Sequence, residues 1–206
     1  AGEALQGLGT ACKAVGVAIA AAAAAVSAAA IAAGKALIQM TREGAEYADS
    51  VLTESQVTGI ATDKLQEYMY AAELVDVSVE TLTGSMAKNI KSMKSAADGS
   101  SAYANAYEQL GVSVTNADGS LRDSNEVYWE LIDALGTVEN ETERDALAMQ
   151  LLGRSAQDLN PLIIAGSERM AELGEEARNA GYVLSGDLLE AYGAYDDAVQ
   201  RFNNGT

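Results

Sequence analysis

Apolar residues recur at steps of three and four along most of the chain beyond residue 40. Residues 62–74 carry one such stripe, and residues 79–97 carry another, in which Leu82, Met86, Ile90 and Met93 recur. This spacing places side chains on one face of an α-helix, so each stripe predicts a helix that packs against a partner surface. We interpret the methionines as core-filling residues rather than as contacts to a cofactor.

Residues that cap helices precede these stripes. The side chain of Ser, Thr, Asp or Asn accepts a hydrogen bond from a free backbone N–H group in the first turn, and Glu or Gln three residues later strengthens the pattern. We therefore expect helices to begin at or just after Thr53, Thr62, Ser78, Asp123 and Asn140.

Glycine and proline mark further helix boundaries. Gly136, Gly153 and Gly181 each follow an apolar stripe, which predicts that a helix ends there. We expect Gly153 to have the positive φ of a residue that follows a helix. Ser155 begins a short turn, and Pro161 stands at a first helical position, where its missing N–H group is not needed.

Residues 110–122 break the helical pattern. Leu110, Val112 and Val114 alternate with polar residues, and an Asp–Gly pair follows, which is typical of a short β-hairpin or tight turn. A calcium-binding loop would place Val114 at the first ligand position if Gly119 were its sixth residue, so the turn is the better interpretation. The predicted fold class is all-α: successive capped helices, a long N-terminal Ala-rich helix and this one β element.

The run from 14 to 34 contains no charged residue and lies between Lys13 and Lys35. As a helix it would reach roughly 30 Å, which is long enough for a bilayer core. Most of the run is Ala, however, and insertion into lipid favours Leu, Ile, Phe and Val. We interpret it as a helix that packs closely against copies of itself, with a transmembrane helix as the alternative.

The pattern divides the chain into three sections: a hydrophobic helical arm (1–52), a helical core section (53–109) and an acidic helical section (110–206). The last section ends in a stripe whose steps alternate between four and three, which predicts a seam for another helix. Its members are Leu188, Tyr192, Tyr195, Val199 and Phe202.

The composition is that of a folded, acidic protein. Of 206 residues, 49% are hydrophobic and 21% are charged, and the net charge is −17. Residues 1–40 contribute +1, which leaves −18 for the remainder. Such a surface repels phosphates, so we expect no sequence-specific binding of nucleic acid. The single cysteine, Cys12, cannot form an internal disulfide, which fits synthesis in a reducing cytosol.

Candidate catalytic chemistry is sparse. The chain has no histidine, which excludes a Ser-His-Asp triad and a His-based zinc site. Ser85 and Lys88 match a Ser-x-x-Lys dyad, but no Lys-Thr-Gly element accompanies them, so we interpret them as neighbours on one helix face. The acidic pairs at 175–176 and 196–197 are expected to face solvent because adjacent helical residues point apart. We predict no catalytic, cofactor-binding or metal-binding residue, and no enzyme activity.

Several ordered stretches resemble a known family. These are "KLQEYMYAAELVDVSVETLTGSMAKNIKSM" at 64–93, the "LGV" turn from residue 110, and "ERDALAMQLLGRSAQDLNPL" at 143–162. They are similar to the core region of tail tape measure proteins of long-tailed bacteriophages and prophages. The similarity covers about residues 45–204, and the Ala-rich arm is similar to the hydrophobic helical segment that accompanies this core. Family members are much longer, so the chain would be one section of such a protein.

The resemblance implies a structural function without cofactors. Tape measure proteins form helical multimers inside the tail tube, set the tail length during virion assembly, and leave ahead of the DNA at infection. The implied partners are other copies of the chain, tail tube and tail tip proteins, tail assembly chaperones, and the host membrane during ejection. The implied location is the tail lumen of the virion, after synthesis in the bacterial cytoplasm, with transfer to the host cell membrane on ejection.

Two other functions are alternatives. A membrane-active, pore-forming module for genome passage would use the Ala-rich arm, and leakage from liposomes would distinguish it from a scaffold. A cell-wall hydrolase segment would need a pair of carboxylates in a cleft, and incubation with peptidoglycan would test for it.

Overall fold

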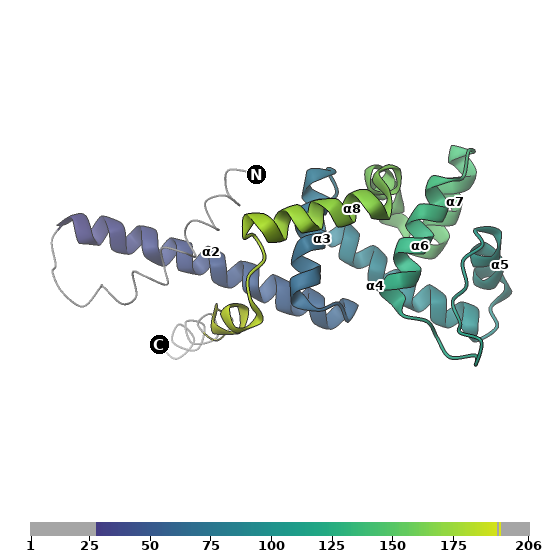
Figure 1. Ribbon diagram of the computed structural model, residues 1–206, viewed down its shortest axis with the longest axis horizontal. Helices are drawn as coiled ribbons and strands as arrows, with labels where there is room; N and C mark the ends of the chain where they lie inside the picture. Colours follow the sequence, from purple (N-terminus) through teal and green to yellow (C-terminus); the bar gives the residue numbers. More distant parts are fainter. Residues whose placement is uncertain (1–27, 193, 195–206) are drawn as a thin grey trace.

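The computed structural model describes residues 28–192 and 194, with side chains from residue 43, and these residues form an all-α fold (Figure 1). The elements are α2 (Ala28–Thr58), α3 (Thr62–Leu74), α4 (Val79–Ala97), α5 (Ser101–Gln109), α6 (Ser124–Gly136), α7 (Glu141–Leu152), the 3-10 helix η1 (Arg154–Leu159) and α8 (Asn160–Ala180). A further helical stretch covers residues 186–192.

The alanine-rich run lies largely outside the described residues. Only residues 28–34 of it are described, as the first part of α2. The predictions of self-packing and of a transmembrane helix therefore remain predictions. Among the helices that the structure describes, none is long and apolar enough to cross a membrane. With 31 residues, α2 is roughly 46 Å long, and Figure 1 shows it extending away from the other helices.

Helix α4 lies at the centre of the fold and contacts α2, α3, α5, α6, α7 and η1 (Figure 1). Helix α8 packs against α3 and α6 beside it. One hydrophobic core extends from Ala48 to Tyr192 and includes residues of both predicted sections beyond residue 52. The described residues of the sections 53–109 and 110–206 therefore pack on a shared core.

The predicted apolar stripes of α3, α4 and α6 are the buried faces of these helices. Leu65 and Met69 of α3 are buried, and so are Leu131 and Leu135 of α6. In α4, the predicted members Leu82, Met86 and Met93 are buried, whereas Ile90 is only half-buried. Periodicity thus identifies which face of each helix joins the core.

Three of the predicted caps are confirmed. The side chains of Ser78, Asp123 and Asn140 each accept hydrogen bonds from backbone N–H groups of the first turns of α4, α6 and α7. The prediction at Thr53 is wrong, because that residue lies inside α2. Thr62 is the first residue of α3 rather than its cap.

The predicted boundaries after residue 135 match the structure closely. Gly136 is the last residue of α6, and Gly181 follows α8. Gly153 follows α7 with φ +99° and ψ 179°, a conformation open essentially only to glycine. Pro161 lies in the first turn of α8, as predicted. The short turn expected from Ser155 is the 3-10 helix η1, which begins one residue earlier.

The predicted β-hairpin at 110–122 is not confirmed. Thr115 and Leu121 form one isolated antiparallel bridge around a tight turn, and the described residues contain no strand. The pairing cannot extend, because Asp123 already caps α6 two residues after Leu121, and Val112 is buried in the core.

Helix α8 is kinked between the start that the sequence predicts at Pro161 and the end that it predicts at Gly181. Gly166 has φ +74° and ψ 172°, which interrupts the helix. Asp133 of α6 accepts hydrogen bonds from the backbone N and the Oγ of Ser167, at 2.7 and 2.6 Å. Because these are the contacts of an N-cap, a residue of another helix caps the second half of α8.

Of the two described members of the predicted C-terminal seam, Tyr192 is buried as predicted and Leu188 is not. Leu188 is 36% exposed, whereas Leu189 and Tyr192 are buried. Tyr192 contacts α2 beside Gly44, where an added Cβ would lie 3.0 Å from the tyrosine ring. Tyr195, Val199 and Phe202 lie outside the described residues.

Replacing Gly153 with Val should lower the free energy of unfolding by roughly 1–3 kcal/mol, measured by urea denaturation. An added side chain has room, since the nearest atom is Lys88 Cγ at 3.5 Å, so the cost comes from the backbone conformation. Gly84→Val is the matched control, because Gly84 lies in a regular helix with open space around it. Equal effects of the two substitutions would contradict this explanation.

Asp133→Ala should destabilise the fold by about 1 kcal/mol, because it removes the cap of the second half of α8. Asp158→Ala, an exposed acid on η1, should have little effect. Hydrogen exchange should show faster opening of the amides just after Ser167 in the Asp133 variant alone. Unchanged exchange there would show that the cap does not hold this segment.

Candidate functional site

Ser85 and Lys88, the pair that matches a Ser-x-x-Lys dyad, have separate partners. Ser85 is fully buried; its Oγ donates to the Leu82 carbonyl oxygen at 2.7 Å and lies 2.7 Å from the Tyr128 hydroxyl. Lys88 donates to the Tyr103 hydroxyl at 3.1 Å, and its ammonium lies 4.9 Å from the centre of that ring. The lysine is thus engaged on α5, and the serine takes part in core packing.

The acidic residues considered as candidates lie on the surface. Glu175 and Glu176 are exposed, and the Tyr70 hydroxyl donates to Glu176 at 3.4 Å. The pair at 196–197 lies outside the described residues. Within the described part of the chain, no three acidic, histidine or cysteine side chains are grouped so that they could hold a metal ion.

A row of polar side chains is buried along α4, and sequence reasoning missed it. Ser85, Asn89 and Ser92 are spaced by four and three residues and are fully buried; we call them the α4 polar seam. The Asn89 side chain accepts from the Tyr107 hydroxyl at 2.7 Å and donates to the Ser124 carbonyl oxygen at 3.2 Å. Their periodic spacing, in phase with the apolar stripe, was the signal that could have revealed them.

The α4 polar seam connects α4 to three surrounding helices. Ser92 donates to the carbonyl oxygen of Leu151 in α7 at 2.8 Å, while Tyr107 and Tyr128 reach the seam from α5 and α6. Burial raises the pKa of both tyrosines above its usual value. Each hydroxyl is therefore neutral at ordinary pH. This arrangement orients helices and contains no activated nucleophile.

A second buried polar contact joins α3 to α8. The Glu67 side chain is 2% exposed and accepts from Lys64 Nζ at 2.9 Å and from Arg178 Nε at 2.8 Å. Gly174 makes the approach possible, because an added Cβ would lie 3.1 Å from Glu67 Cβ. The buried carboxylate is thus paired with two cations, as burial of a charge requires.

Gln66, next to this ion pair, holds the segment that follows α8. Its amide nitrogen donates to the Leu184 carbonyl oxygen at 3.0 Å, and its amide oxygen accepts from the Leu184 N–H at 2.8 Å. Gln66 is itself 2% exposed. Both backbone groups of one residue are therefore held by one buried side chain.

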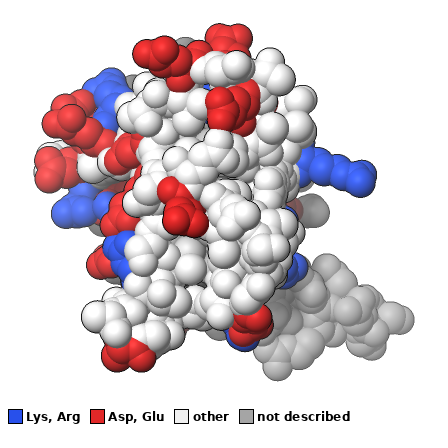
Figure 2. All heavy atoms as spheres, turned by 90° about the vertical axis from the view of Figure 1, so that its right-hand side faces the viewer, with Lys and Arg blue, Asp and Glu red and all other residues white. Residues whose placement is uncertain are grey.

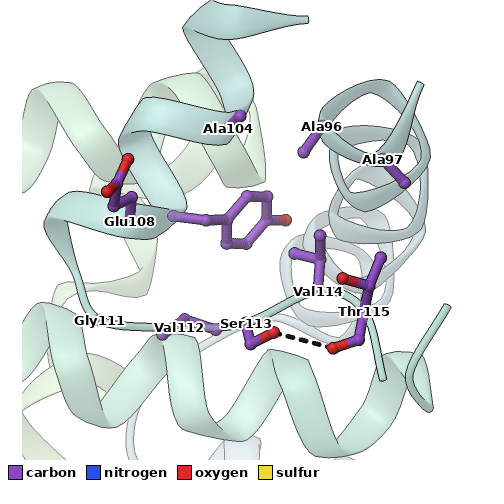
Figure 3. Close-up of a pocket in the computed structure, with 10 residues that line it drawn as sticks. Ala96, Ala97, Ala104, Glu108, Gly111, Val112, Ser113, Val114 and Thr115 are labelled. Carbon is purple, nitrogen blue, oxygen red and sulfur yellow. Dashed lines mark hydrogen bonds between the residues drawn. The ribbon is translucent and has the colours of Figure 1, made fainter. Parts of the chain in front are cut away.

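The structure also has a surface hollow of about 530 Å³ between α4, α5 and the loop that follows α5 (Figure 3). Ala96 and Ala97 come from α4, and Ala104 comes from α5. The other lining residues are Tyr107, Glu108, Gly111, Val112, Ser113, Val114 and Thr115. Glu108 is the only charged residue in this lining, so the hollow is mostly apolar and weakly acidic.

Figure 2 shows the end of the molecule at which α5 and α7 lie. Acidic and basic side chains both lie along the edges of this face, and uncharged residues fill most of its centre. A partner at this end would therefore meet a largely neutral surface with a border of mixed charge.

Comparisons with protein-family models, with curated proteins and with solved structures find no match to this chain. The candidates for function within the described residues are therefore the hollow and the overall helical architecture. The buried polar contacts have a structural role.

Stability should fall when the pH rises above about 10, the usual pKa of tyrosine. Because burial raises the pKa of Tyr107 and Tyr128, the folded protein keeps protons that the unfolded chain loses. The stability that these two protonated hydroxyls contribute is complete at a pH below the pKa of tyrosine in the unfolded chain. It is lost as the pH rises through the higher pKa of the folded state. Absorbance titration should show these two tyrosines ionising together with alkaline unfolding, and Tyr128→Phe should remove one of them. Ionisation of all tyrosines near pH 10 without unfolding would contradict this prediction.

Proposed function

We propose that this chain is a section of a tail tape measure protein. It would belong to a helical multimer inside the tail tube that sets tail length and leaves ahead of the DNA at infection. Its partners would be other copies of itself, tail tube and tail tip proteins, tail assembly chaperones, and the host membrane during ejection.

One observation carries the proposal: residues of the most distinctive similar block have defined structural roles. The block at 143–162 forms α7, η1 and the start of α8. Its members Leu147, Ala148, Ala156, Leu159 and Leu162 are buried. Gly153 has a conformation reserved for glycine, and Pro161 lies in the first turn of α8.

A resemblance carried by fold-determining residues supports a shared fold more strongly than one carried by surface residues would. Similar function does not follow from a similar fold alone. The inference of a similar function is supported by the order of the similar stretches along the chain and by the Ala-rich arm before them.

The helical architecture also suits a measuring role. A helix has a fixed rise of about 1.5 Å per residue, so its length reports the number of residues. Helix α2 projects from the body and continues the Ala-rich run, so residues added there would lengthen the molecule along one axis (Figure 1). The net charge of −17 would also limit adhesion to DNA that must pass through the same tube.

The proposal predicts a change in tail length in the phage or prophage that encodes the chain. Inserting 36 alanine-rich helical residues immediately before Ala28 should lengthen tails by about 54 Å, rounded to a whole number of tube rings. The matched control inserts the same residues between Asp118 and Gly119, in the surface turn, and should leave the length unchanged. Electron microscopy of purified tails measures both. Tails of unchanged length that contain the first variant would refute the proposal.

A further inference from the structure

The loop that forms one wall of the hollow has two backbone edges, and within the described residues only one of them pairs with another backbone segment. The Asn116 N–H donates to the Ser120 carbonyl oxygen at 2.8 Å, and the Arg122 N–H donates to the Val114 carbonyl oxygen at 3.0 Å. In such a pairing, successive residues direct their backbone groups to opposite edges. Ser113 and Thr115 therefore direct theirs to the other edge.

This second edge presents hydrogen-bond donors. Within the described residues, no group accepts a hydrogen bond from the N–H of Ser113 or of Thr115. Their carbonyl oxygens, in contrast, have donors: Arg122 Nη1 at 3.0 Å from the Ser113 oxygen, and Ser113 Oγ at 2.9 Å from the Thr115 oxygen. A partner at this edge would have to supply hydrogen-bond acceptors.

Ser113 and Thr115, the residues of this edge, are among those that line the hollow (Figure 3). Small side chains on the two helices, Ala96, Ala97 and Ala104, leave the space that larger residues would fill. Val112 and Val114 contribute apolar surface from the loop. Where a peptide is bound as an added strand, main-chain hydrogen bonds give affinity and a pocket for a side chain gives specificity. This loop is not a strand, but it offers two backbone donors beside an apolar hollow.

We propose that this edge and hollow form a docking site for an extended, cationic peptide segment of a partner protein. Carbonyl oxygens of the peptide accept from the N–H groups of Ser113 and Thr115, and an aliphatic side chain of the peptide occupies the hollow. Basic residues flanking it pair with Glu108, the one charged group of the lining. The proposal is independent of the tape measure function.

Charge decides between a foreign peptide and a second copy of the chain. Two copies could pair their free edges about a two-fold axis. That pairing would bring two Glu108 side chains together. Repulsion between like charges opposes this dimer, whereas it favours a basic segment.

The test measures binding of a fluorescein-labelled peptide of alternating Lys and Val, seven residues long, to the full chain by fluorescence anisotropy. Thr115→Pro removes one N–H donor, Ala104→Leu fills the hollow, and Glu108→Gln removes its charge. We expect the first two variants to weaken binding at least tenfold and the third about threefold. Ala102→Leu, on the exposed side of α5, and Glu80→Gln, at the start of α4, are the matched controls and should bind as the native chain does.

NMR keeps the test decisive if Thr115→Pro or Ala104→Leu fails to fold. Addition of the peptide to the native chain should shift the amide signals of Ser113 and Thr115 most strongly. A peptide with Gly in place of Val should bind at least tenfold more weakly.

Three results would overturn the proposal. Equal binding by all variants would mean unspecific attraction to an acidic surface. No binding would mean that water alone covers the edge. A dimer in sedimentation that Thr115→Pro abolishes would make a second copy the occupant.

Discussion

The positions of the helices depend on the polar groups that α4 buries at the centre of the fold. Ser85, Asn89 and Ser92 have no access to water, so each must find a hydrogen-bond partner in the core or cost free energy. The partners lie on α5, α6 and α7. Apolar contacts tolerate small shifts of one helix along another, whereas these bonds fix the rotation and depth of each helix around α4.

A similar constraint acts where the chain leaves the body. Gln66 and Glu67 are adjacent in α3, and both are buried. Gln66 holds the backbone of Leu184, and Glu67 holds Arg178 near the end of α8. The helical stretch that follows returns to α2, so the described chain begins and ends on the same side of the body (Figure 1).

Stretches whose structure depends on neighbours in sequence were predicted well. The caps at Ser78, Asp123 and Asn140 form hydrogen bonds within three residues, and the conformation of Gly153 follows from the helix end that it marks. Thr53 shows the limit of this reasoning. Its pattern is that of a cap, but Ala48 and Val51 are buried on the same helix, so α2 continues through it. Packing overrode the local signal.

The sequence alone determined the all-α class, the buried faces of α3, α4 and α6, and most helix ends, because periodicity and capping are local properties of the chain. It also supplied the resemblance on which the proposed function rests. Only the tertiary structure decided the polar seam, the kink of α8 and the hollow beside the free edge. Asp133 and Ser167 are 34 residues apart, and Gln66 and Leu184 are 118 apart. A polar side chain can be buried only when such a distant partner is brought to it, and no local pattern specifies which partner that will be.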